Sequence, residues 1–118
     1  MTEFTDSTAE SFSPHVTTVR NDKFHRYELL VDGEVAVISQ FMDKPGHIDF
    51  LHTETRPQFK GRGLAKVLAH FALDDVVASG KRIIPHCPFI AAYLRRHEGY
   101  ELDVDWPPEA PVGDPDNE

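Results

Sequence analysis

The segment Gln-Phe-Lys-Gly-Arg-Gly-Leu-Ala at residues 58–65 places two glycines and two basic side chains directly before a helical apolar pattern. The first turn of a helix has N–H groups without intrahelical partners and the positive end of the helix dipole. A phosphate or pyrophosphate can bind there. Gly61 and Gly63 leave the backbone accessible and tolerate positive φ, while Lys60 and Arg62 add positive charge. The segment therefore predicts an anion-binding loop.

The spacing of these residues excludes two common phosphate-binding loops. No Gly-Lys-Ser/Thr follows, so the segment is not a Walker A loop. Lys66 stands where the pattern G-x-G-x-x-G requires its third glycine. What remains is Gln58-x-x-Gly61-x-Gly63, between a predicted strand and a predicted helix. The structural alternative is a strand–loop–helix corner whose glycines serve only the geometry of the turn.

The pattern Gln-x-x-Gly-x-Gly resembles the pyrophosphate-binding signature of the GNAT superfamily of acyl-CoA-dependent N-acetyltransferases. The resemblance extends to His-Thr-Glu-Thr at residues 52–55 and to Ile-Ile-Pro-His-Cys-Pro-Phe at residues 83–89. In these segments the chain looks like the small, single-domain, YjdJ-type subgroup, over about residues 27–100. Thr55 departs from the subgroup, which more often has valine at this position.

This resemblance implies acetyl-CoA as a co-substrate and an amine as acceptor, either a small molecule or a peptide or protein. The pyrophosphate would lie on the N–H groups of residues 59–64. The pantetheine arm would pair like a short strand with the backbone of residues 53–55. The implied coenzyme-binding residues are Thr53, Glu54, Thr55, Gln58, Phe59, Lys60, Gly61, Arg62, Gly63, Leu64, Ala65 and Cys87.

Acetyl transfer to an amine needs a general base, an N–H donor for the thioester oxygen and a proton for the leaving thiolate. Cys87 precedes Pro88 at a predicted helix start, where the helix dipole and the adjacent His86 would lower the pKa of a thiol. The resemblance places this cysteine near the thiol of CoA. It either takes the acetyl group covalently or lines the pocket; the alternative is an inert buried cysteine.

Four further residues are candidates for proton transfer. Asp49, His52 and Glu54 lie on the predicted strand that leads to the loop, where GNAT enzymes often carry a carboxylate base. Strand alternation predicts His52 and Glu54 on one face and Asp49 on the other, so that the three do not share one pocket. The alternative for each of them is a place on the polar outer face of a half-exposed sheet. Tyr93 matches a tyrosine with which many GNAT enzymes protonate the thiolate, but it shares an apolar stripe with Ile90 and has an alternative packing role.

The elements that must position these residues follow from turn signals and periodicity. Asp-Gly at 32–33 predicts a hairpin between strands at 24–31 and 34–42, preceded by a short strand at 16–20. A strand over 47–55, a helix from Leu64 to Gly80, a strand over 81–85 and a helix from Pro88 to Gly99 follow, with a possible last strand at 101–104. The predicted fold is α/β, a minimal GNAT fold of order β-β-β-β-α-β-α with a mixed, mostly antiparallel sheet.

Composition bounds the remaining possibilities. A length of 118 residues suits a single domain. Residues 1–14 and 105–118 are predicted to be loosely held tails, the second acidic and proline-rich, which leaves 15–104 as a GNAT-like acetyltransferase domain. The formal net charge of −8 argues against nucleic acid as a partner. The single cysteine and the spacing of the seven histidines predict no metal site.

No apolar run approaches the roughly 20 residues that a membrane span needs, and the N-terminus lacks the features of a signal peptide. The sequence therefore predicts a cytoplasmic protein with no membrane partner, acting as a monomer or homodimer. Two other functions stay open at this stage. The chain is alternatively a non-catalytic acyl-CoA-binding module or sensor, or an interaction protein whose acidic tails recruit a basic partner.

Overall fold

The computed structural model describes residues 15–111 of the chain. Its elements are β2 (Val16–Asn21), β3 (Arg26–Val31), β4 (Glu34–Lys44), β5 (His47–Thr55), the 3₁₀ turn η1 (Pro57–Phe59), α2 (Leu64–Ala78), β6 (Arg82–Pro85), α3 (Pro88–Arg96) and the 3₁₀ turn η2 (Glu101–Asp103). This order of five strands and two helices confirms the predicted α/β class and is consistent with a minimal GNAT fold.

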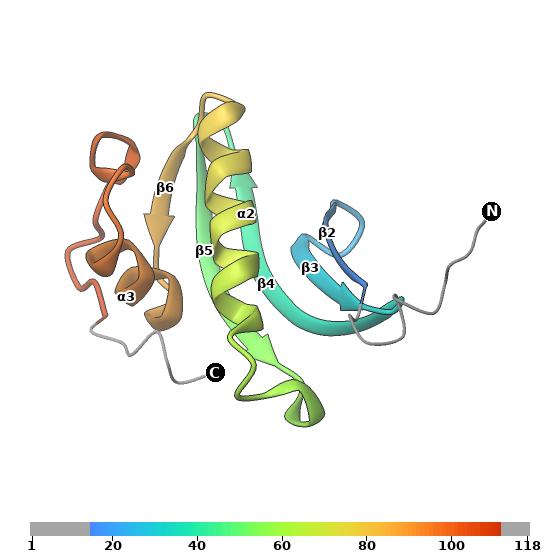
Figure 1. Ribbon diagram of the computed structural model, residues 1–118. Helices are drawn as coiled ribbons and strands as arrows, with labels where there is room; N and C mark the ends of the chain where they lie inside the picture. The colour runs from blue at the N-terminus through green and yellow to red at the C-terminus, as the bar shows by residue number, and fades with distance from the viewer. Residues whose placement is uncertain (1–14, 112–118) are drawn as a thin grey trace.

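The five strands form one mixed sheet in the order β2-β3-β4-β5-β6. The first four are antiparallel neighbours joined by short turns, and β6 is parallel to β5. At the β3–β4 hairpin, Asp32 and Gly33 have φ of 51° and 85°, the left-handed pair that a two-residue type I′ turn requires. The parallel pair needs a crossover, and α2 supplies it across one face of the sheet, as Figure 1 shows.

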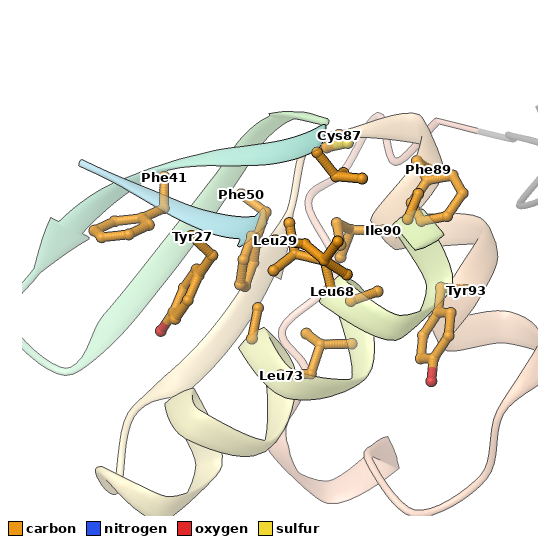
Figure 2. Close-up of a cluster of buried hydrophobic side chains, with 14 of the residues drawn as sticks. Tyr27, Leu29, Phe41, Phe50, Leu68, Leu73, Cys87, Phe89, Ile90 and Tyr93 are labelled. Atoms are coloured by element: carbon orange, nitrogen blue, oxygen red, sulfur yellow. The ribbon is translucent and has the colours of Figure 1, made fainter. Parts of the chain in front are cut away.

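The main hydrophobic core lies between this face of the sheet and the two helices (Figure 2). Tyr27 and Phe50 of the sheet, Leu68 of α2 and Ile90 of α3 are all fully buried within it. The spacing of apolar residues in the sequence predicts one buried stripe along α2, made of Leu64, Val67, Leu68, Phe71, Ala72 and Val76, but Val67 is 47% exposed. The residues that α2 buries are Leu68, Ala72 and Val76, as predicted, together with Ala65, Ala69 and Leu73. The small side chains of the three alanines allow close approach to the sheet.

The possible last strand at 101–104 is not formed. Residues Glu101–Asp103 make a 3₁₀ turn, and Val104 alone bridges to Ile83 beside β6. The cause is local, because the Glu101 carboxylate accepts a hydrogen bond from the N–H of Gly99 at 2.9 Å and folds the chain back. Leu102, at 88% exposed, has no core to enter.

Residues 105–111 remain in contact with the domain. Asp105 accepts two hydrogen bonds from the Arg82 guanidinium, at 2.6 and 2.7 Å. The Arg95 guanidinium lies 4.7 Å from the Trp106 ring centroid and donates to the carbonyl oxygen of Pro111 at 2.5 Å. This segment thereby runs along the outer side of β6 and α3.

Candidate functional site

The strands β5 and β6 separate halfway along β5. Their pairing ends where Phe50 meets Pro85. There the N–H groups of His86 and Cys87 both donate to the carbonyl oxygen of Phe50, at 3.0 and 2.9 Å, and the chain turns into α3. Residues 51–55 therefore pair with β4 on one side and, within the described range, with no strand on the other. An open strand edge offers N–H and C=O groups to an extended ligand.

The helix-covered side of this separation holds the thiol. Cys87 is the N-cap residue of α3, and its side chain is 2% exposed. Its thiol donates to Oγ1 of Thr53 at 3.3 Å, and this hydroxyl also pairs with Oγ of Ser39 at 3.0 Å. Thr55, two residues on, is buried as well, and its hydroxyl has no hydrogen-bond partner among residues 15–111. The structure thus brings together Cys87 and Thr53, two residues that the sequence resemblance assigns to the coenzyme site.

The opposite face of the sheet corrects the prediction for Asp49. Along β4, the alternate residues Met42, Gln40 and Ile38 share one face, and they pair with Asp49, His52 and Glu54 in that order. The pairing skips Leu51, which is a β-bulge in β5. One extra residue reverses the strand alternation beyond it. Asp49, His52 and Glu54 therefore lie on the same face, not on opposite faces.

These three side chains are nevertheless in different surroundings. His52 and Glu54 are more than half exposed, and His52 Nε2 lies 3.2 Å from Oε1 of Glu54. Asp49 is 6% exposed. The bulge thus places one buried carboxylate and one exposed His–Glu pair along the same strand, on the face that α2 does not cover.

Three cationic or titratable side chains surround the Asp49 carboxylate. Lys44 donates to Oδ2 at 3.1 Å, and His86 Nε2 lies 3.4 Å from the same oxygen. His47 Nε2 lies 3.3 Å from Oδ1. The geometry at Oδ1 does not make a hydrogen bond, and this buried oxygen has no hydrogen-bond partner in the described structure. A buried carboxylate oxygen without a donor is costly, which makes this position unusual for a purely structural residue.

The glycine loop leads from β5 to α2 through the turn η1. Gly61 and Gly63 have φ of 80° and 73°, a conformation that residues with a side chain rarely adopt. A Cβ built at either position would meet no atom within 4 Å, so both glycines face open space. Gly63 is the N-cap of α2, and no acidic residue lies in the first turn of the helix. The start of α2 therefore keeps its positive polarity.

Two side chains, those of Gln58 and Phe59, hold the base of this loop, while its basic side chains remain exposed. The Phe59 ring is buried, with the Arg62 guanidinium 5.3 Å from its centroid. Gln58 donates to a carboxylate oxygen of Glu34 at 3.3 Å. Lys60 and Arg62 remain exposed beside the two glycines. The predicted pyrophosphate loop is thus fixed at its base and open and positive at its tip.

A family model described as GCN5-related N-acetyl-transferase matches residues 26–104, which is more than half of the chain. The chain belongs to this family. The matched region runs from the start of β3 to the residue that bridges to β6, so it contains the separated strands and the glycine loop. No curated protein matches the sequence.

In this GCN5-related N-acetyltransferase, Tyr93 lies away from the other predicted catalytic residues. Its ring stacks on His97 with centroids 3.8 Å apart. Its side chain lines a hollow of about 340 Å³ that Asp74 and Tyr100 also line. Figure 2 shows the hydroxyl directed away from Cys87. Burial, and then the negative charge of Asp74, raise the pKa of Tyr93 above its ordinary value.

Sequence reasoning missed three residues that contact the predicted site residues. Ser39 comes from β4 and Lys44 from its far end, and neither position carries a motif. His86 was considered only as a neighbour of Cys87, whereas its side chain lies against Asp49. The parallel register of β5 with β6 creates this last contact, and a sequence alone does not give that register. A histidine at the predicted end of β6 was the available signal.

Other classes of site are not found in the described part of this acetyltransferase. Residues 15–111 contain no group of three or more His, Cys, Asp or Glu side chains placed to hold a metal ion. Among the same residues, no helix is long and apolar enough to cross a membrane.

Proposed function

We propose that this protein transfers an acetyl group from acetyl-CoA to an amine. The observation that carries the proposal is the start of α2, where two positive-φ glycines and two exposed basic side chains surround an acid-free helix N-terminus. A diphosphate fits such a place because both the helix dipole and the local charge are positive. Membership of an acetyltransferase family supports the same reading.

The open edge of β5 then receives the pantetheine arm. Residues 51–55 face the gap left by β6, and they run towards the loop that would hold the diphosphate. An extended amide-containing chain can pair with such an edge as an additional strand would. It would bring the thioester to the point where His86 and Cys87 share the carbonyl of Phe50.

We infer direct transfer to the amine, with Cys87 lining the site. The thiol is buried and donates to Thr53, whose hydroxyl accepts it. A nucleophilic cysteine needs a base that removes its proton. The nearest histidine in sequence, His86, instead lies against Asp49.

The acceptor reaches the thioester from the face that α2 leaves open. Met42, Leu51 and His52 are all exposed there. Such an open face suits an amine on a peptide or protein better than a small molecule enclosed on all sides.

The experiment mixes the full chain with acetyl-CoA and four amines: a lysine-containing peptide, a peptide with a free N-terminus, a polyamine and an arylamine. Release of CoA and mass of the product are followed. Acetylation of at least one amine is expected. Tight acetyl-CoA binding without transfer to any amine would favour a non-catalytic acyl-CoA sensor. Absence of binding by calorimetry would favour an interaction protein and overturn the proposal.

A further inference from the structure

Asp49 and His86 form a pair on the acceptor side of the strand separation. The carboxylate is 6% exposed, whereas the His86 side chain is 44% exposed. A buried acid beside an accessible imidazole attracts one ring nitrogen by its charge and leaves the other ring nitrogen for other partners. Because Nε2 is 3.4 Å from Oδ2 of Asp49, the carboxylate favours the proton on Nε2. Nδ1 then carries the lone pair that can accept a proton.

Backbone geometry places this pair next to the thioester site. Consecutive residues of extended backbone direct their side chains to opposite faces. His86 and Cys87 are both anchored to the carbonyl of Phe50, and Cys87 has extended φ and ψ of −77° and 127°. Their contacts agree, since Cys87 reaches Thr53 and His86 reaches Asp49. One side of the separation therefore holds the thiol and the other holds the imidazole.

His86 also lines a hollow that is separate from the coenzyme loop. Its volume is about 310 Å³, and its other lining residues are Pro107, Pro108 and Glu109. The Arg82–Asp105 pair and the bond from Arg95 hold this segment in place. A hollow with one carboxylate and two prolines suits a cationic group on a short aliphatic chain, as an acceptor ammonium is.

We propose that His86 is the general base that takes the proton of the acceptor ammonium in this hollow, and that Asp49 is its positioning residue. The proposal rests on the proposed acetyl transfer. The ammonium loses one proton to Nδ1 of His86. The neutral nitrogen then forms a C–N bond with the thioester carbonyl carbon, the C–S bond breaks, and the second nitrogen-bound proton passes to the thiolate. His86 releases its proton to water, so the products are amide, CoA and one proton.

Other charged groups face this pair and act on its protonation. Lys44 and His47 contact the same carboxylate from β4 and β5. Glu109 lines the same hollow as His86, and Asp105 interacts electrostatically with His47. Three carboxylates, those of Asp49, Asp105 and Glu109, and one lysine therefore accompany the two imidazoles, and the pH dependence belongs to the group as a whole.

The test uses the full chain and the amine from the panel with the fastest CoA release. His86→Gln is expected to lower kcat by about 100-fold, the lower range for loss of a general base. Its affinity for acetyl-CoA, measured by calorimetry, is expected to stay within about twofold of wild type. Imidazole added to His86→Ala should restore part of the activity. His70→Gln, a histidine change in the exposed part of α2, is the control and should keep wild-type kcat.

The pH profile separates a positioning role of Asp49 from a merely structural one. Wild-type activity should fall as pH decreases through the imidazole range, and His86→Gln should lack this fall. Asp49→Asn removes the charge that stabilises imidazolium, so the fall should move to lower pH. Wild-type turnover that survives in His86→Gln would overturn the assignment of the base and leave acetyl transfer intact. Failure of wild type to acetylate any amine would overturn both.

Discussion

At the C-terminal half of α2, two acidic side chains each accept a hydrogen bond from a tyrosine, whereas the N-cap position of the same helix is Gly63, which has no side chain. Asp75 accepts from the hydroxyl of Tyr27 at 2.8 Å, and Asp74 accepts from Tyr100 at 2.6 Å. Burial, and then these hydrogen bonds, raise the pKa of both tyrosines above the ordinary value. At the other end, Gly63 faces open space.

The two ends of α2 differ in the role of their polar groups. Those at the C-terminal half stabilise the fold, whereas those at the N-terminus are proposed to bind a ligand. A buried hydroxyl paired with a carboxylate in the same chain has completed its interactions. A helix start without an acidic residue in its first turn, beside exposed basic side chains, keeps a positive electrostatic polarity. The same contrast applies to Asp49, where one buried oxygen has no hydrogen-bond donor in the described residues.

Between the two ends of α2, the largest expected effect comes from placing an anionic side chain at the glycine-capped N-terminus. Asp and Asn both tolerate positive φ better than other side chains, so Gly63→Asp and Gly63→Asn form a matched pair. The carboxylate repels the diphosphate, and Gly63→Asp should bind acetyl-CoA about 30-fold more weakly than Gly63→Asn, or about 2 kcal/mol. Calorimetry on both folded variants measures this ratio. Equal affinities would mean that the diphosphate lies elsewhere.

At the C-terminal half of α2, a substitution should lower the stability of the fold and leave the affinity for acetyl-CoA unchanged. Tyr27→Phe removes the hydroxyl that pairs with Asp75 and should cost about 1–2 kcal/mol in urea unfolding. Because the folded state raises the pKa of Tyr27, this contribution is complete below about pH 10 and is lost as pH rises further. Wild type should therefore lose more stability than Tyr27→Phe in alkali. A large loss of acetyl-CoA affinity in this variant would contradict the division of α2 into two ends.

The open end of α2 could be predicted from the sequence because its determinants are local. Glycine spacing, adjacent charge and the switch of period from strand to helix all lie within a few residues around Gly61. The hairpin at Asp32-Gly33 and the parallel β6 follow from equally short signals. These signals were enough to give the order of elements and the position of the glycine loop before α2.

The Asp49–His86 pair could not be predicted in this way, since it depends on two long-range features. The bulge at Leu51 decides which face Asp49 occupies, and strict alternation gave the wrong face. The register of β5 with β6 then decides which residue of the following segment meets it. Val67 shows the same limit of sequence-based prediction on a helix. Its position fits the helical period, but which side of α2 is buried depends on how the alanines pack against the sheet.

Substitution of Cys87 tests whether its hydrogen-bonded thiol has a structural role, as the hydrogen-bonded hydroxyls of Tyr27 and Tyr100 do. If its bond to Thr53 is structural, Cys87→Ala should lower kcat by less than about tenfold, since only one hydrogen bond and a little packing are lost. Intact-protein mass spectrometry after incubation with acetyl-CoA should find no acetyl group on wild-type Cys87. Cys87→Ser, which keeps a donor for Thr53, is the control. An adduct, or a loss of about 1,000-fold in both variants, would instead assign covalent transfer.

The smallest effect is expected from substitution of Tyr93. This residue lies near the C-terminal half of α2, where polar side chains stabilise the fold. Its hydroxyl points away from Cys87, and its ring lies beside His97 and Asp74. A proton donor to the thiolate must come within hydrogen-bond reach of the sulfur. Tyr93→Phe should therefore keep kcat within about twofold, as Tyr100→Phe should, although the latter loses about 1 kcal/mol of stability with its bond to Asp74. A 100-fold loss of kcat in Tyr93→Phe at unchanged stability would move this residue into the active site, because packing alone does not produce that combination.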